Sequence, residues 1–148
     1  HQGVEAGWRW AACEPVTLNG SYTFTRTTME TGAFDRHQLP LTPRNQGAVG
    51  VEADLGYGLL FTTQTRIVGP RYLLNDLGNT TRGLGAYAVT DLGMRWRSGK
   101  FQAWATAYNV FEREYYDNGG IGGFPHGSRE AFNPAAGAHY EIGTQIVF

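Results

Sequence analysis

Arginine, tyrosine and histidine side chains gather in two segments of this 148-residue chain, residues 70–87 and 111–138. They are Arg71, Tyr72 and Arg82 in the first segment and Arg113, Tyr115, Tyr116, His126 and Arg129 in the second. A guanidinium group donates charge-assisted hydrogen bonds to anions, and both it and an aromatic ring stack on planar groups. These residues could therefore bind an anionic, planar metal chelate. The alternative is that they only line a hydrated rim and contact no ligand.

The sequence predicts neither a metal site nor a catalytic centre. Histidines occur at His1, His37, His126 and His139. None of them lies at a short spacing from another histidine, a cysteine or a pair of carboxylates, so we expect no metal ligands and no cofactor. The serines lack the strand–turn–helix context of a hydrolase nucleophile, which argues against an enzyme.

The glycine-rich run from Gly119 to Gly123 could be compared with a phosphate-binding loop. It lacks the Lys-Ser/Thr pair that follows such a loop and the helix that supplies a positive amino terminus. We therefore expect it to be a flexible loop tip.

Length and composition limit the class of protein. A chain of 148 residues predicts one domain, and a net charge of −1 argues against a nucleic-acid partner. The single cysteine, Cys13, excludes an intrachain disulfide. The 21 glycines and many aromatic residues of the chain favour an all-β protein that is rich in turns. No apolar run approaches the ~20 residues of a membrane-spanning helix.

Seven segments alternate between apolar and polar side chains with the period of two that is typical of a β-strand. They cover about residues 3–11, 16–27, 46–55, 59–69, 88–97, 100–110 and 140–148. Each has roughly the 9–12 residues that a tilted strand needs to cross a bilayer. Segment 100–110 has apolar residues on both faces. The pattern therefore does not decide whether the face with Phe101 or the face with Trp104 joins the apolar face of the sheet.

The last segment has the clearest division into two faces. One face carries Tyr140, Ile142, Thr144, Ile146 and Phe148. The opposite positions are mostly polar or glycine, and the chain stops on the aromatic residue. This pattern is typical of the last strand of a bacterial outer-membrane β-barrel, which faces lipid outside and water inside.

The connections between these segments alternate in length. Short ones cover about residues 12–15, 56–58 and 98–99, and long ones cover about residues 28–45, 70–87 and 111–138. A barrel with tight turns on one side of the membrane and large loops on the other produces this alternation. If Phe148 ends at the periplasmic face, all three long loops lie outside the cell.

Several stretches also resemble motifs of one protein family. Leu39–Gly47 is similar to a Pro-x-His/Asn strand entry, and Val68–Tyr72 to a Gly-x-x-Tyr strand exit. Asn109–Tyr115 is similar to an Asn-Leu-Phe-Asp-x-x-Tyr motif, although it has Val and Glu where the motif has Leu and Asp. Tyr140–Phe148 is similar to the terminal strand that the outer-membrane insertion machinery recognises. Together they resemble the C-terminal barrel region of TonB-dependent outer-membrane receptors of the siderophore-receptor type.

The resemblance implies an all-β fold, an antiparallel up-and-down meander of about seven strands that forms part of a transmembrane β-barrel. Residues 1–148 would be the C-terminal portion of the receptor barrel, without the plug domain and the earlier strands. It implies a place in the bacterial outer membrane and uptake of ferric siderophores with energy from TonB.

The resemblance also implies partners and further residues. The expected partners are outer-membrane lipid, a ferric siderophore or similar ligand, the TonB complex through the plug region, and the insertion machinery. The residues that it assigns to structure or insertion are Asn109, Phe111, Tyr140, Ile142, Ile146 and Phe148. The eight loop residues named above would contact the ligand.

Other functions stay open on the sequence alone. Within transport, the ligand could be cobalamin or another scarce nutrient. The chain could instead be a small structural or adhesin-like outer-membrane barrel, or a soluble β-sandwich binding protein. An outer-membrane protease or lipase would need clustered acidic residues or a Ser-His pair at the strand tops, and neither is apparent.

Overall fold

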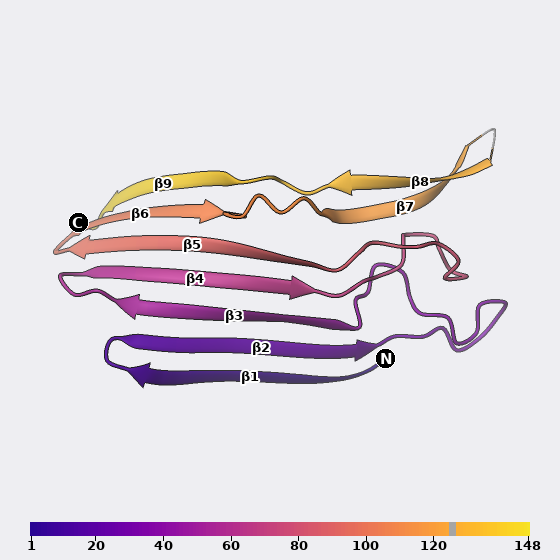
Figure 1. Ribbon diagram of the computed structural model, residues 1–148, viewed down its shortest axis with the longest axis horizontal. Helices are drawn as coiled ribbons and strands as arrows, with labels where there is room; N and C mark the ends of the chain where they lie inside the picture. The colour runs from indigo at the N-terminus through magenta and orange to yellow at the C-terminus, as the bar shows by residue number, and fades with distance from the viewer. Residues whose placement is uncertain (125–126) are drawn as a thin grey trace.

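A computed structural model describes residues 1–124 and 127–148, which form nine β-strands. The strands are β1 Gln2–Cys13, β2 Val16–Arg26, β3 Asn45–Asp54, β4 Leu59–Val68, β5 Tyr87–Ser98, β6 Phe101–Tyr108, β7 Tyr116–Phe124, β8 Gly127–Pro134 and β9 His139–Ile146. Seven of them make one antiparallel sheet in the order β1-β2-β3-β4-β5-β6-β9, and β7 pairs with β8 in a separate hairpin (Figure 1). No helix in the described part of the chain could span a membrane.

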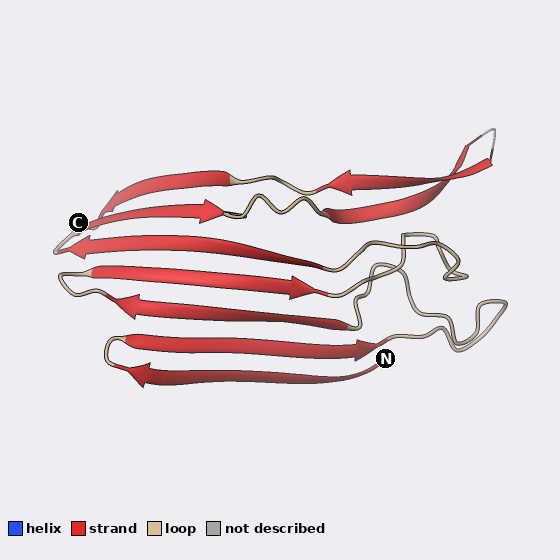
Figure 2. Cartoon of the chain, viewed as in Figure 1, coloured by secondary structure: helices blue, strands red, loops and turns tan. Residues whose placement is uncertain are grey.

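The seven strands expected from alternation are all present, and they pair in sequence order as a meander (Figure 2). The three short turns and the carboxyl terminus lie at one end of the sheet, and the three long connections lie at the other. The expected division of short and long connections between the two ends is therefore confirmed.

The longest connection differs from the expectation. Residues 111–138, expected as a loop, contain strands β7 and β8, which continue outward beyond β6 and β9 as a hairpin (Figure 1). The run from Gly119 to Gly123 lies within β7, so the prediction of a flexible loop tip is wrong for this run. Gly119 is needed because the backbone of β7 packs closely against the buried side chains of Leu73 and Leu84.

The register of β6 is resolved by its pairing with β9. Ala105 lies opposite Ile142, and Phe101 lies opposite Ile146, so these four residues share one face. Trp104 therefore belongs to the opposite, polar face, where its ring lies directly over Gly143 and leaves no room for a Cβ there. The bulky indole is accommodated because the facing residue has no side chain.

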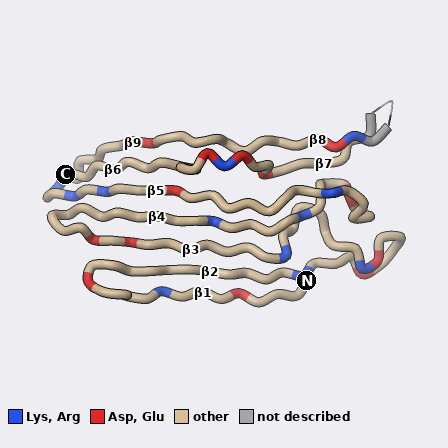
Figure 3. Tube along the Cα trace, in the orientation of Figure 1, with Lys and Arg blue, Asp and Glu red and all other residues tan. Residues whose placement is uncertain are grey.

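The two faces of the sheet differ sharply in charge, as the pairing register shows. Figure 3 marks where the charged residues lie along the chain. Register places nearly all charged residues of the seven strands on one face, the exception being Arg26 at the end of β2. They are Glu5, Arg9, Glu52, Asp54, Arg66, Asp91, Arg95, Arg97 and Glu141. On this face Arg9 of β1 forms an ion pair of 2.8 Å with Glu52 of β3, across the intervening β2. The other face carries most of the aromatic and aliphatic side chains of the strands.

The buried core lies at the end with the long connections, not at the middle of the sheet. Val68, Tyr87 and Val89 form a buried cluster against which Tyr115 packs, and Leu73 and Leu84 are fully buried nearby. The outward-facing Ile142, by contrast, is 81% exposed. The sheet is thus a single layer, and β1 and β9 are its two edge strands among the residues described.

Candidate ligand-binding loop layer

Three segments come together at the end of the sheet where the long connections lie (Figure 1). We call their described residues, 27–44, 69–86, 109–124 and 127–138, the loop layer. The central segment, 69–86, is bonded to both of its neighbours. The three segments therefore contact one another and are not independent loops.

On one side, the central segment joins residues 27–44 through a side-chain amide. The backbone N–H of Gln38 donates to Asn79 Oδ1 at 2.7 Å, and Asn79 Nδ2 donates back to the Gln38 carbonyl at 2.9 Å. The Leu41 N–H donates to the Tyr72 carbonyl at 2.9 Å. The amide of Asn79 thus satisfies both backbone groups of a buried residue, as a paired strand would.

On the other side, the central segment joins the β7–β8 hairpin by a short parallel bridge. The Leu74 N–H donates to the Gly119 carbonyl at 2.8 Å, and the Ile121 N–H donates to the Leu74 carbonyl at 2.8 Å. A Cβ on Gly119 would lie 2.8 Å from Leu73 Cδ2 and 3.3 Å from Leu84 Cδ2. The glycine is needed because the backbone of β7 rests directly on these buried leucines.

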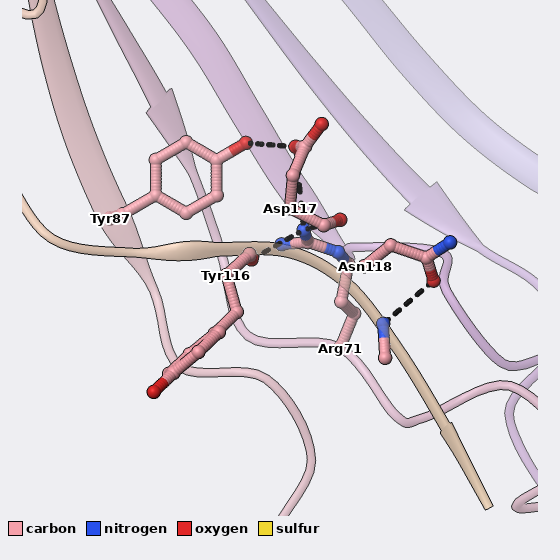
Figure 4. A network of polar contacts seen from close by, with 6 residues as sticks. Arg71, Tyr87, Tyr116, Asp117 and Asn118 are labelled. Atoms are coloured by element: carbon pink, nitrogen blue, oxygen red, sulfur yellow. Dashed lines mark hydrogen bonds and ion pairs between the residues drawn. The ribbon is translucent and has the colours of Figure 1, made fainter. Parts of the chain in front are cut away.

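Arg71 extends from the central segment beneath β7 (Figure 4). Its Nη2 donates to the carbonyl of Asp117 at 2.6 Å and to that of Tyr116 at 3.3 Å, and it lies 3.9 Å from Asp117 Oδ1. Its guanidinium carbon lies 5.5 Å from the centre of the Tyr87 ring, within cation–π range. Only 5% of the Arg71 side chain is exposed, so these contacts take up most of its surface.

Tyr87, the first residue of β5, belongs to the same network. Its hydroxyl donates to Asp117 Oδ1 at 3.2 Å (Figure 4), and its ring lies 4.2 Å from that of Tyr115 with 31° between the planes. One aromatic residue thus contacts the arginine, the carboxylate and the segment that leads into β7. These contacts fix the base of the hairpin to the sheet.

Asp76 organises the turn within the central segment. One carboxylate oxygen accepts from the backbone N–H and hydroxyl of Thr80, and the other accepts from those of Thr81, at 2.6–3.1 Å. Burial alone would raise the pKa of Asp76, but the four donated hydrogen bonds stabilise the ionised form and lower its pKa below the ordinary value. The carboxylate is therefore a structural acceptor of this turn.

Asn109 ends β6 and turns the chain toward β7. It has a positive φ of 50°, its N–H donates to Asp91 Oδ1 at 2.9 Å, and its Oδ1 accepts from the Arg113 N–H at 2.8 Å. Its Nδ2 donates to the Arg113 carbonyl at 3.0 Å. Asparagine tolerates this backbone conformation and bonds its own turn, which gives a physical reason for its place in the motif.

The eight residues expected to contact a ligand differ in accessibility. Arg82, Arg113, Tyr116 and Arg129 are exposed, Tyr72 and Tyr115 are half-buried, Arg71 is buried, and His126 lies outside the described residues. Arg71 and Tyr116 meet in the network of Figure 4, and Arg71, Tyr72 and Arg82 line one cavity. Ligand contact by each of them stays a prediction.

The residues assigned to structure or insertion lie where the motif and the alternation place them. Asn109 is buried, Phe111 is 78% exposed, and Tyr140, Ile142 and Ile146 share the apolar face of β9. Phe148 follows β9 and is fully exposed. Their role in insertion stays a prediction.

Three residues that hold the layer together, Gln38, Asp76 and Asn79, were not predicted from the sequence. The order Asp76, Asn79, Thr80, Thr81 carries a usable pattern, because Asp and Asn side chains bond backbone groups a few residues on. Nothing in the sequence indicates that Gln38 pairs with Asn79, which lies 41 residues away.

Comparison with known proteins gives relatives over most of the chain. A family model described as TonB dependent receptor-like, beta-barrel matches residues 1–111. The pesticin receptors of Yersinia enterocolitica and Yersinia pestis are each 27% identical over 149 residues, covering 98% of this chain. The chain spans 21% of the length of these relatives.

Solved structures share the fold. The ferric yersiniabactin uptake receptor FyuA from Yersinia pestis superposes with a TM-score of 0.79 at 24% identity, covering 99% of this chain and 23% of its own. BauA, the ferric preacinetobactin receptor from Acinetobacter baumannii, has a TM-score of 0.75 at 20% identity, covering 96% of this chain and 21% of its own. At this level of identity, the likeness establishes the architecture alone.

Proposed function

The chain belongs to the TonB-dependent receptor β-barrel family, and from this premise we propose that it forms part of the wall of a receptor that takes up ferric siderophores with energy from TonB. Members of this family are outer-membrane proteins of Gram-negative bacteria, and the chain is an outer-membrane protein. The family consists of transporters and receptors, and we expect the chain to perform no covalent chemistry.

One observation carries the proposal: a single-layered sheet with one apolar and one charged face bears a bonded loop layer at one end only. The apolar face suits hydrocarbon, and the charged face suits a hydrated interior. A layer with loops fixed to one another presents a preorganised outer surface, which lowers the entropic cost of binding a ligand there.

The chain supplies only part of such a receptor. We propose that residues 1–148 form the C-terminal portion of the barrel, and that the plug domain and the earlier strands belong to the rest of the receptor. TonB would act through the plug region. The outer-membrane insertion machinery would recognise the terminal strand through Tyr140, Ile142, Ile146 and Phe148, with Asn109 and Phe111 shaping the preceding hairpin.

The ligand would bind on the loop layer. Exposed Arg82, Arg113 and Arg129 offer positive charge, and Tyr116, three residues after Arg113, offers an exposed aromatic ring. Tyr72, Tyr115 and His126 are further candidates. Arg71 would act from beneath, through its bonds to the hairpin. An anionic ferric chelate fits this combination of cations and aromatic rings.

Uptake in cells tests the proposal. Deleting the gene of the full-length receptor from its host should abolish uptake of radioactive iron supplied as the ferric siderophore, and so should loss of TonB. Restoring the intact receptor should restore uptake. Iron uptake unchanged by the deletion, with loss of radioactive cobalamin uptake instead, would favour the alternative nutrient receptor. Loss of neither would leave a structural or adhesin-like barrel as the better explanation.

A further inference from the structure

A cavity of about 350 Å³ lies within the loop layer, between residues 27–44 and the central segment, at the ends of β3 and β4. Three arginines, Arg44, Arg71 and Arg82, line it together with Tyr72. No Asp or Glu is among its described lining residues. Its volume is in the range of small-molecule sites, and its lining carries an excess of positive charge.

Gln38 holds one of these arginines in place. It is 6% exposed, and its Oε1 accepts from Arg44 Nε at 2.7 Å, while its Nε2 donates to the Thr42 carbonyl at 2.7 Å. Because both ends of the amide are bonded, the direction of its oxygen is fixed. The partner is neutral, so this bond orients the Arg44 guanidinium without neutralising its charge.

Arg71 contributes a second, buried cation to the lining. Its Nη1 is buried and has no hydrogen-bond partner among the described residues. Buried donors of this kind are nearly always bonded in folded proteins, so the Arg71 guanidinium keeps an unused hydrogen-bonding group next to the cavity lining. Arg82 is exposed at the same cavity, and its charge would be available to an incoming anion.

We propose that this cavity binds an oxyanion, a carboxylate or phosphate group, through the guanidinium groups of Arg44 and Arg82 with Tyr72 beside them. Planar guanidinium groups match the geometry of such anions. The group can belong to a soluble anionic ferric chelate, in which case the site rests on the proposed function, or to the phosphate of an outer-leaflet lipid. The two sources share one chemistry and are separated by experiment.

Inorganic phosphate is the first probe, added to the purified full-length receptor in uncharged detergent. Its phosphorus NMR line should broaden saturably as the receptor is added. The double variant Arg44→Gln/Arg82→Gln should weaken binding by roughly tenfold or more, because it replaces two charged donors with neutral polar side chains. Binding equal to that of the unmodified receptor would overturn the proposal.

Two further variants separate binding from folding and from general charge. Arg82→Glu places a repelling charge at an exposed position and should abolish binding without affecting thermal unfolding. Arg36→Gln removes a loop-tip arginine whose side chain is 92% exposed and lies 3.6 Å from Asp35, outside the cavity. It should leave phosphate binding unchanged; a loss equal to that of the double variant would show nonspecific attraction and refute the site.

Competition then assigns the source. Displacement of phosphate by ferric citrate, an anionic ferric chelate, would assign the site to a soluble ligand. Loss of phosphate binding in nanodiscs that contain phosphorylated lipid A, but not in those with dephosphorylated lipid A, would assign it to the lipid. Binding that neither competitor reduces would mark phosphate as an adventitious ion only and would overturn the proposal. A receptor that binds phosphate through these arginines yet transports no iron would refute only the proposed function.

Discussion

The sheet and the loop layer bury their side chains in opposite ways. Among the residues whose burial is described, the buried side chains all lie in the loop layer or at the strand ends that enter it: Thr27, Gln38, Val68, Arg71, Leu73, Asp76, Leu84, Tyr87, Val89 and Asn109. The middle of the sheet has backbone ladders but no second layer to cover either face. The sheet therefore depends on lipid and on the barrel interior, whereas the loop layer is stabilised by its own contacts.

The largest expected effect comes from a charge on the apolar face of the sheet. Ile142→Arg should destabilise the full-length receptor in phospholipid vesicles by about 2–4 kcal/mol, because the guanidinium would enter hydrocarbon. Denaturant unfolding measures the change. Thr106→Arg, on the charged face of the neighbouring strand, is the matched control and should change stability much less. Equal losses from both variants would remove the distinction between the two faces.

Asn109→Ala is expected to have the next largest effect, confined to the loop layer. It removes the amide bonds to Arg113 and leaves an alanine at a positive φ, which together should cost about 2 kcal/mol locally. Hydrogen exchange in residues 109–115 should rise in the full-length receptor while exchange in β3 and β4 stays the same. Asn75→Ala is the control for backbone strain, because it also places alanine at a positive φ, 68°, but removes only one exposed side-chain bond. A uniform rise across the sheet would contradict independent stabilisation of the two regions.

Gly119→Ala tests the contact between the β7–β8 hairpin and the central segment by adding one carbon atom. The new Cβ would crowd Leu73 and the Ala131 carbonyl at 2.8 Å, and we expect a loss of about 1–2 kcal/mol in the docking of the hairpin. Faster exchange of the Leu74 and Ile121 amides would report it. Gly85→Ala has open space around its new Cβ and should leave both amides unchanged. Protection of these amides in the Gly119 variant would mean that the hairpin is not held by this contact.

The smallest expected effect is a pH dependence of the central segment. Because the pKa of Asp76 is lowered in the folded state, its contribution to stability is complete above its ordinary pKa of 3.8 and is lost as the pH falls through the lower folded value. Exchange in residues 76–81 should therefore increase on acidification. Asp76→Asn should remove this pH dependence, and its persistence in that variant would show that another group is responsible.

Local patterns made the sheet predictable. Alternation along each strand depends only on neighbouring residues, and connection length can be counted, so the strands, their order and the two ends followed from the sequence. The register of β6 did not, because both of its faces are apolar. It is decided by the contact of Trp104 with Gly143, two residues that are far apart in sequence.

The loop layer was less predictable, because its strands and bonds depend on contacts between residues that are distant in the sequence. The glycines of β7 have no side chains to alternate, so their strand was hidden until the buried Leu73 and Leu84 beneath it were placed. The type and segment of Arg71 make it a candidate for ligand contact. Its bonds to Tyr116 and Asp117 could not be predicted, because these partners lie 45 and 46 positions further along the chain and only the fold brings them close.

Spin labels placed one at a time along β9 test most directly the claim that its alternate residues meet hydrocarbon and water. In the full-length receptor with Cys13→Ser, reconstituted in phospholipid bilayers, labels at Ile142→Cys, Thr144→Cys and Ile146→Cys should collide more with oxygen, which concentrates in lipid. Labels at Glu141→Cys and Gln145→Cys should collide more with a water-soluble nickel complex. Accessibility that shows no period of two along β9 would contradict the account.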